Sequence, residues 1–212
     1  YNPNPNLSVL VYGSSFFMNT YDLIQDMTFS QARDWTAGTK VTYHVKDWFS
    51  VTGSLHADFY DRFKRHERID KRQKDYESSI YQPRLTVTSN YFNGHSLILG
   101  MEHTSDELTS DRFSGNANHD LKTRALKETE YFLQDEWTIN PRWMISAGIR
   151  TNFSKAFGFM GMPKVAAKYS PDKHWSLRAN YSMGYRSPSI KELFFNWDHL
   201  GMFMIRGNEN MR

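Results

Sequence analysis

Apolar and polar side chains alternate along much of this chain, and the alternation is clearest between Tyr131 and Arg150. Two runs with a period of two residues flank Asn140 and Pro141, which predicts two antiparallel β-strands joined by a tight turn. In the second run the apolar face holds Trp143, Ile145, Ala147, Ile149, Thr151 and Phe153, whereas Met144, Ser146, Gly148, Arg150 and Asn152 point the other way. The pattern therefore predicts a sheet with two chemically different faces.

The spacing of aromatic residues indicates what the apolar face contacts. Pairs of aromatic residues on that face lie ten positions apart: Trp143 and Phe153, Trp175 and Tyr185, Phe49 and Phe59, and Tyr81 and Tyr91. Ten steps of about 3.3 Å on a strand tilted by roughly 40° rise about 25 Å, which matches the apolar band of an outer-membrane barrel between its two aromatic girdles. Strands of soluble sandwiches average only about five or six residues. The spacing therefore favours a transmembrane barrel over a soluble sandwich.

Segments with this strand pattern lie near residues 7–18, 35–46, 48–62, 77–92, 95–104, 124–139, 142–154, 163–170 and 174–186. The connections between them alternate in length. Short turns fall at 46–47, 93–94, 140–141 and 171–173, and most of the others are long, at 19–34, 63–76 and 105–123. Short periplasmic turns and long extracellular loops are typical of outer-membrane proteins. The predicted fold class is all-β, an antiparallel transmembrane β-barrel.

Nine strands would leave open sheet edges, which are not tolerated in hydrocarbon. We therefore expect further strands outside this sequence, in a complete barrel of about 22 strands whose lumen is closed by a plug domain that this chain lacks. The sequence starts at Tyr1 and ends in a predicted loop, so it reads as part of a longer protein. We expect barrel strands with extracellular loops over residues 1–186. We expect residues 187–212 to form an extracellular loop with a short helix, truncated before the following strand.

The tryptophans and arginines test the orientation of these strands. Four of the six tryptophans lie within a few residues of the short turns, where they would form a periplasmic girdle: Trp48, Trp137, Trp143 and Trp175. A register slip of one residue would turn Arg150 and Arg178 toward lipid, at a cost of roughly 2 to 4 kcal/mol each near the midplane. The same parity places His44 and His56 in the lumen. The polar face is therefore predicted to face inward.

The composition agrees with this prediction and excludes several classes of protein. Of the 212 residues, 39% are hydrophobic and the mean hydropathy is −0.67, a low value that polar lumen-facing side chains explain. The absence of cysteine excludes a disulfide framework and thiolate metal sites. A formal charge of +3 is too small to indicate nucleic-acid binding. No nucleophile elbow, zinc-binding helix motif or phosphate-binding glycine loop is present, so we expect no enzyme.

Several segments together resemble the TonB-dependent outer-membrane receptors: FLQDEW (132–137), AGIR (147–150), PKVAAKYSP (163–171) and NYSMGYRSPSIKELFF (180–195). The most specific part is YRSPSIKEL (185–193) followed by GNENM (207–211), similar to the paired boxes that flank a histidine in an extracellular loop of haem receptors. Tyr185 and Ser187 stand where those receptors have Phe and Ala, and Glu209 and Met211 stand where they have Pro and Leu. Similar boxes occur in cobalamin and ferric-siderophore receptors, particularly Bacteroidetes-like ones.

The resemblance implies an integral protein of a Gram-negative outer membrane that imports a scarce, large nutrient: haem or a related ferric chelate, or, as the alternative, cobalamin. The energy would come from TonB, acting on the plug through a TonB box outside this chain. Further expected partners are the membrane lipid and lipopolysaccharide, with a surface lipoprotein as an optional one and no nucleic acid. Outside this family, the alternatives are an outer-membrane barrel enzyme and a passive porin.

The resemblance also points to a ligand site in the loop that follows Pro188. It places His199 as the ligand of haem iron, with Met202 or Met204 as soft partners. Trp197, Met202 and Phe203 would line the site, and Arg186, at the lumen end of its strand, would meet an anionic ligand or the plug. The structural alternative is a loop histidine packed among neighbouring aromatic side chains: Phe194, Phe195, Trp197 and Phe203.

Two further segments carry local predictions. Ser187 and Pro188 have the residue types of a helix N-cap and first helical position, which predicts a short helix that starts there and runs through Ile190, Lys191, Glu192 and Leu193. The segment 61–75 holds seven Lys or Arg against four Asp or Glu. We interpret it as a solvated hairpin extension. The alternative is contact with lipopolysaccharide phosphates or substrate carboxylates.

Overall fold

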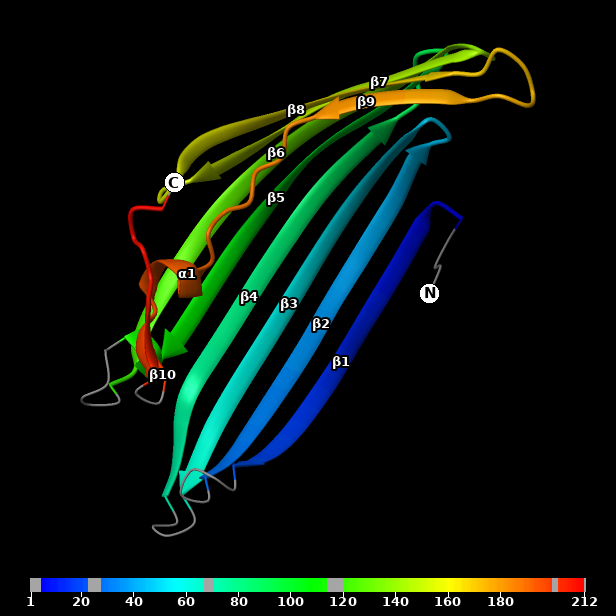
Figure 1. Cartoon of the computed structure of the whole chain (residues 1–212). Helices are drawn as coiled ribbons and strands as arrows, with labels where there is room; N and C mark the ends of the chain where they lie inside the picture. Colours follow the sequence, from blue (N-terminus) through cyan, green and yellow to red (C-terminus); the bar gives the residue numbers. More distant parts are fainter. Residues whose placement is uncertain (1–4, 23–27, 67–70, 114–119, 200–201, 212) are drawn as a thin grey trace.

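The computed structural model describes residues 5–22, 28–66, 71–113, 120–199 and 202–211. One antiparallel sheet holds nine strands in sequence order: β1 (Leu7–Asp22), β2 (Thr28–Lys46), β3 (Phe49–His66), β4 (Lys71–Ser89), β5 (His95–Ser110), β6 (Lys122–Asn140), β7 (Trp143–Ser154), β8 (Gly158–Tyr169) and β9 (Leu177–Ser182). Each strand pairs with its neighbours in the chain, so the sheet is an up-and-down meander. Figure 1 shows this nine-stranded sheet, here called the wall, as tall and twisted.

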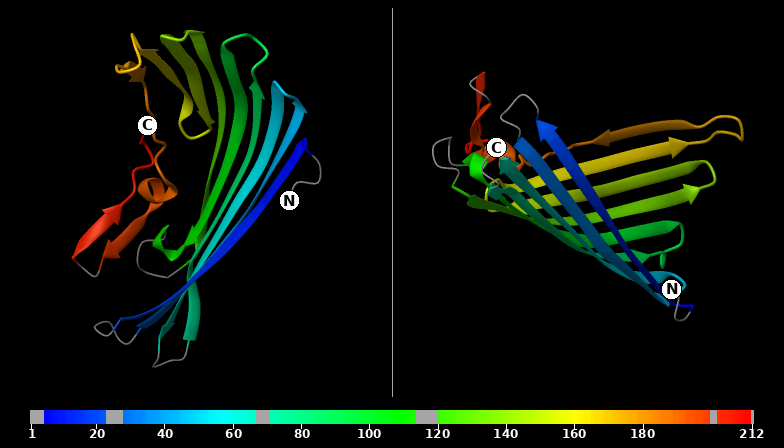
Figure 2. Two further views of the ribbon diagram at one scale, coloured as in Figure 1. Left: turned by 90° about the vertical axis from the view of Figure 1, so that its right-hand side faces the viewer. Right: turned by 90° about the horizontal axis from the view of Figure 1, so that it is seen from below.

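The remaining elements belong to the rim of this wall and to the segment after β9. A 3-10 turn (Asp111–Phe113) follows β5, and after β9 come helix α1 (Ile190–Phe194) and a small hairpin of β10 (Asn196–His199) and β11 (Phe203–Arg206). Residues 187–199 and 202–211, here called the return segment, fold back beside the wall instead of extending the sheet (Figure 2). They lie toward the end opposite the short turns, which we call the outer rim (Figure 1).

The register assigns the two faces of the wall. Through the central part of every strand, even-numbered residues share one face and odd-numbered residues share the other, as the pairing of Arg150 with Phe132 and of Ile149 with Leu133 illustrates. The even-numbered face, here called the lumen face, carries Arg150 and also His44 and His56. The odd-numbered, outward face exposes large apolar side chains, including Leu99, Leu133 and Ile149. The predicted orientation of the strands is therefore correct.

The aromatic girdle at the short turns consists of several ring contacts between neighbouring strands. Trp48 lies 4.8 Å from Tyr91, and His95 stacks on Trp137 at 5.2 Å, both measured between ring centroids. Further along the same end, Trp143 stacks on Tyr169 at 4.4 Å. A second set of outward pairs lies nearer the outer rim: Phe17 with Trp35, Phe59 with Tyr81, and Phe153 with Phe159. The two levels are those expected of a strand that crosses a membrane.

The predicted long loops are wrong in length. Most of the residues expected in loops at 19–34 and 63–76, and eight of those at 105–123, belong to strands, which run on to Asp22, His66 and Ser110. Strands that continue beyond the membrane no longer need an apolar outward face, so the alternating pattern that identifies them fades. The last strand is shorter than the predicted 174–186, because only Leu177–Ser182 is assigned to β9. In the part of the chain that the structure describes, no helix is long and apolar enough to cross a membrane.

Candidate ligand-capture site at the outer rim

The return segment begins with a capped helix. The Ser189 hydroxyl oxygen accepts a hydrogen bond from the backbone N–H of Glu192 (3.3 Å), and the Glu192 carboxylate accepts one from the backbone N–H of Ser189 (2.8 Å). This reciprocal capping box makes Ser189 the N-cap, not Ser187 as predicted. Ser187 lacks a glutamate three residues later. Instead, its hydroxyl oxygen accepts a hydrogen bond of 3.4 Å from the Asn152 amide on the lumen face of β7.

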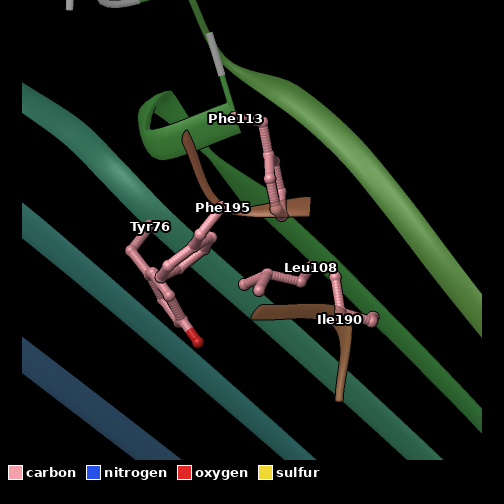
Figure 3. Packing of buried hydrophobic residues seen from close by; sticks show 5 residues of the cluster. All are labelled: Tyr76, Leu108, Phe113, Ile190 and Phe195. Carbon is pink, nitrogen blue, oxygen red and sulfur yellow. The ribbon is translucent and has the colours of Figure 1, made fainter. Parts of the chain in front are cut away.

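The helix packs on the lumen face near the outer rim. Ile190, Leu193 and Phe195 are buried, and Ile190 and Phe195 join Tyr76, Leu108 and Phe113 in one apolar cluster (Figure 3). These wall residues come from β4, β5 and the 3-10 turn, so elements far apart in sequence meet there. Fully burying an aliphatic side chain contributes about 1.5 to 3 kcal/mol. The apolar cluster therefore fixes the helix to the wall.

Cations from the wall hold the aromatic side chains of the return segment. The Arg112 guanidinium lies 4.1 Å from the centroid of the Trp197 ring, and the Arg124 guanidinium lies 4.9 Å from that of Phe194. One contact has the reverse arrangement, with the cation on the return segment and the ring on the wall: the Lys191 ammonium lies 5.2 Å from the centroid of the Tyr76 ring. Burial, together with the nearby charge of Arg62, lowers the pKa of the Arg112 guanidinium from its ordinary value. Poor solvation of the cation strengthens such contacts.

A buried ion cluster supports the wall beside the apolar cluster. Asp75 lies in a bulge where the pairing of β3 and β4 shifts by one residue, and its side chain is only 3% exposed. Its carboxylate accepts two hydrogen bonds from Arg62, at 3.1 and 2.8 Å, and lies 3.2 Å from the Lys64 ammonium. In addition, its backbone carbonyl accepts one from the fully buried hydroxyl of Ser110. The described residues of the segment 61–75 form the predicted hairpin extension. The prediction that the side chains of this segment are solvated is wrong at Asp75, which is buried.

The two sequence boxes contact each other. The Asn208 N–H donates to the carbonyl of Glu192 (2.9 Å), and the Gly207 N–H donates to the carbonyl of Phe195. Gly207 packs so tightly on Leu193 that an added Cβ would collide with the Leu193 carbonyl. The boxes therefore close the base of the β10–β11 hairpin, a role that only a residue without a side chain can fill at position 207.

Arg186 does not end a strand on the lumen side, because β9 stops at Ser182. Its guanidinium instead forms an exposed ion pair of 2.6 Å with Glu192. This hydrogen bond, followed by those from Ser189, lowers the pKa of the Glu192 carboxyl to about 2. Arg186 thus stabilises the start of the return segment, next to the helix cap.

The other predicted site residues lie in the hairpin. Trp197 pairs with Ile205, and His199 pairs with Phe203 in the backbone register of β10 and β11, whereas the side chain of His199 lies outside the described residues. Met202 is 67% exposed and Phe203 is 55% exposed, and Met204 and Ile205 are also exposed. The hairpin is therefore anchored at its base and apolar toward its tip. Among the described residues, no group of three or more His, Cys, Asp or Glu side chains is arranged to hold a metal ion.

Sequence reasoning missed Arg112 and Asp75 as parts of this site. Neither carries a motif: Arg112 follows a strand end, and the bulge at Asp75 is visible only in the pairing of β3 with β4. Deeper on the lumen face, the Arg150 guanidinium pairs with the carboxylates of Glu130 and Glu102, and Arg84 pairs with Glu102. The lumen wall is therefore a charged network, as expected of a surface that does not face lipid.

Comparison with known proteins agrees with this architecture. The family model described as "TonB dependent receptor-like, beta-barrel" matches residues 1–212. The "Iron-regulated outer membrane virulence protein" of Vibrio cholerae serotype O1 is 24% identical over 176 residues, in both the El Tor Inaba N16961 and the Classical Ogawa 395 strains. Each match covers 80% of this chain and 25% of the relative, so the chain spans about a quarter of the length of these proteins.

Among solved structures, a variant of the ferric enterobactin receptor of Pseudomonas aeruginosa, in complex with enterobactin, resembles the chain with a TM-score of 0.55 at 13% identity. The superposition covers 99% of this chain and 45% of that one, which supports the fold. The outward apolar band, the two aromatic levels and the match along the whole sequence lead to one conclusion. The chain belongs to the TonB-dependent receptor family and forms part of its integral outer-membrane β-barrel.

Proposed function

We propose that the whole protein imports an iron-centred ligand, haem or a related iron chelate, across the outer membrane with energy supplied through TonB. The family is one of transport receptors, which disfavours an enzyme or a passive porin. The curated relatives are described as iron-regulated, which supports iron as the element acquired. Release into the periplasm would require movement of a plug domain driven by TonB.

The proposed capture of the ligand is supported by one observation, the β10–β11 hairpin that is anchored at the outer rim. Its base is fixed by Gly207 against Leu193 and by the Arg112 guanidinium over Trp197. Toward its tip, the large apolar side chains of Met202, Phe203 and Met204 are exposed. A flat, largely apolar macrocycle bound there would cover these exposed apolar side chains, and a few polar groups nearby would orient the macrocycle. In this proposal His199 would bind the iron axially.

The test is a visible-absorbance titration of the full-length receptor with hemin, run beside a His199→Ala variant, a Phe203→Ala variant and a His174→Ala control. His174 lies in an exposed short turn at the opposite end of the wall. The expected result is a saturable Soret shift in the wild type and the control. We expect the shift to change in form or disappear in His199→Ala, and to need more hemin in Phe203→Ala.

Competition with cyanocobalamin distinguishes the alternative ligand class. Saturable cobalamin binding without a specific hemin shift would replace iron import by cobalamin import, with the apolar hairpin holding the corrin ring. A hemin shift that survives in both hairpin variants would overturn the capture role of the hairpin. Growth of the host on hemin or a ferric chelate as sole iron source, with and without TonB, then tests the transport step.

A further inference from the structure

We infer that the outward face of the wall carries a binding groove for a phosphorylated lipid of the outer leaflet, the lipid A part of lipopolysaccharide. The groove has a volume of about 600 Å³, and His103, Lys127, Thr129, Phe153 and Lys155 contribute to its lining. This site lies on the opposite face from the ligand-capture site and does not depend on the transported ligand.

The register places the groove on the membrane side. His103 pairs with Thr129, and Thr129 pairs with Phe153, so these three side chains share the outward face. Lys127 lies on the same face of β6, two residues closer to the outer rim than Thr129. Beside it, β7 ends at Ser154, opposite Glu128, while β6 continues to Lys122. The groove therefore occupies the step where the short β7–β8 hairpin meets the longer β5–β6 hairpin, a difference in height visible in Figure 1.

The depth of the groove matches the level of lipid phosphates. Phe153 belongs to the aromatic level near the outer rim and lies 5.4 Å from Phe159 between ring centroids. Lys127 is two residues beyond the Thr129–Phe153 pair, or about 5 Å further from the membrane centre on a strand tilted by roughly 40°. Aromatic girdles lie at the boundary between hydrocarbon and headgroups. An ammonium just beyond the girdle therefore meets headgroup phosphates.

The charge of the groove is complementary to phosphate. Neither Lys127 nor Lys155 forms an ion pair within the described ranges, and no carboxylate is among the lining side chains. The nearest acidic side chain on this face by register is Glu107, which pairs with Ala125. The His103 ring is held by a hydrogen bond of 2.9 Å between its Nδ1 and the Thr129 hydroxyl. Two ammonium groups that form no ion pair within the described ranges, and an imidazole held by a hydrogen bond, thus line one groove.

The surface below the groove explains why the occupant is a lipid and not free phosphate. Toward the short turns, the outward face continues with exposed apolar side chains on the same three strands: Met101 and Leu99 of β5, Tyr131 and Leu133 of β6, and Ile149 of β7. This strip would contact acyl chains, while the lysines contact the phosphates of the same molecule. Clustered lysines at a membrane surface are the usual recognition element for anionic headgroups.

The experiment measures lipid binding to the detergent-solubilised full-length receptor by native mass spectrometry. The probes are diphosphorylated lipid A, lipid A without phosphates, phosphatidylglycerol and inorganic phosphate. Lys127→Ala combined with Lys155→Ala is expected to weaken diphosphorylated lipid A binding about thirty-fold, since each lysine near a membrane surface contributes about five-fold. The Lys127→Arg and Lys155→Arg pair should restore it. Phosphate-free lipid A should bind weakly and equally to all variants.

The matched control is Lys164→Ala with Lys168→Ala, which removes two lysines from the lumen face of β8. Retained binding in that control is expected. Equal loss in both double variants would overturn the site, because net charge alone would then account for binding. Equal affinity for phosphatidylglycerol, or for inorganic phosphate, would overturn recognition of a phosphorylated glucosamine lipid. Preserved resistance of each variant to unfolding in detergent establishes that the barrel is intact.

Discussion

The Cζ atom of Arg112 lies 4.1 Å from the centroid of the Trp197 ring and joins the wall to the hairpin of the return segment. Arg112 belongs to the 3-10 turn after β5, whereas Trp197 belongs to β10. The contact therefore fixes the β10–β11 hairpin to the sheet. The cation also lies 5.9 Å from the Phe195 ring, so one guanidinium holds two aromatic side chains in place.

Removing this cation should loosen the hairpin without unfolding the wall. A cation–π contact is worth about 0.5 to 2 kcal/mol, so Arg112→Ala should accelerate trypsin cleavage at the exposed Lys191 and Arg206 roughly two- to thirty-fold. Arg142→Ala, in a short turn at the opposite end, is the control and should leave the rate unchanged. Equal rates in Arg112→Ala and the wild type would contradict the anchoring role of Arg112.

The close approach of Gly207 to Leu193 makes a single methyl group disruptive. Gly207→Ala should displace the hairpin base at a cost of about 1 to 3 kcal/mol, a typical penalty for overpacking. Gly184→Ala is the matched control, because an added Cβ there meets nothing within 4 Å. Hydrogen exchange of the β10–β11 amides would show faster exchange in Gly207→Ala only. Similar exchange in both variants would contradict the packing argument.

The carboxylate of Asp75 compensates two cations in a buried bulge. Asp75→Asn should destabilise the barrel by about 2 kcal/mol, less than the loss of a fully buried pair, because Arg62 and Lys64 retain partial access to water. The measurement is equilibrium unfolding in lipid vesicles by urea. Asp47→Asn, in an exposed turn, serves as the control, and a double-mutant cycle with Arg62→Ala isolates the pair energy. No difference between the two Asn variants would argue against a structural ion cluster.

Acid should release the helix cap. The pKa of Glu192 is about 2 in the folded protein, below its ordinary value of 4.5. A carboxyl with a lowered folded-state pKa contributes stability that is fully present above its ordinary pKa and is lost as the pH falls through the folded value. Protection of the α1 amides, corrected for intrinsic exchange, should therefore decline between pH 4.5 and 2. In Glu192→Gln, protection should be lower at neutral pH and nearly independent of pH in this range.

The assignment of faces can be tested on one strand. Ile149 points outward and is 46% exposed, whereas Ser146 of the same strand points into the lumen. Ile149→Arg should destabilise the folded barrel in vesicles by roughly 2 to 4 kcal/mol, the cost of an arginine at the lipid midplane. Ser146→Arg should cost much less, because the lumen is polar. A larger penalty at Ser146 would reverse the faces.

The sequence by itself determined the wall. The two-residue period between Tyr131 and Arg150 and the ten-residue spacing of Trp143 and Phe153 required a two-faced sheet of membrane height, and the structure has that sheet with the predicted side facing outward. The prediction of the sheet succeeded because lipid requires an apolar side chain at every outward position, so each strand repeats the alternation of apolar and polar residues. The pattern failed above the membrane, where β3 and β5 continue without an apolar face to mark them.

Tertiary structure alone decided how the outer rim is built. The contact of Arg112 with Trp197 joins residues 85 positions apart in a sequence that carries no pattern linking them. Asp75 is buried only because a bulge turns it toward Arg62. These contacts depend on single encounters between distant segments, and no period along the chain encodes them. Lipid surrounds many outward positions and therefore leaves a repeated pattern in the sequence. A contact between two distant segments occurs once and leaves no such pattern.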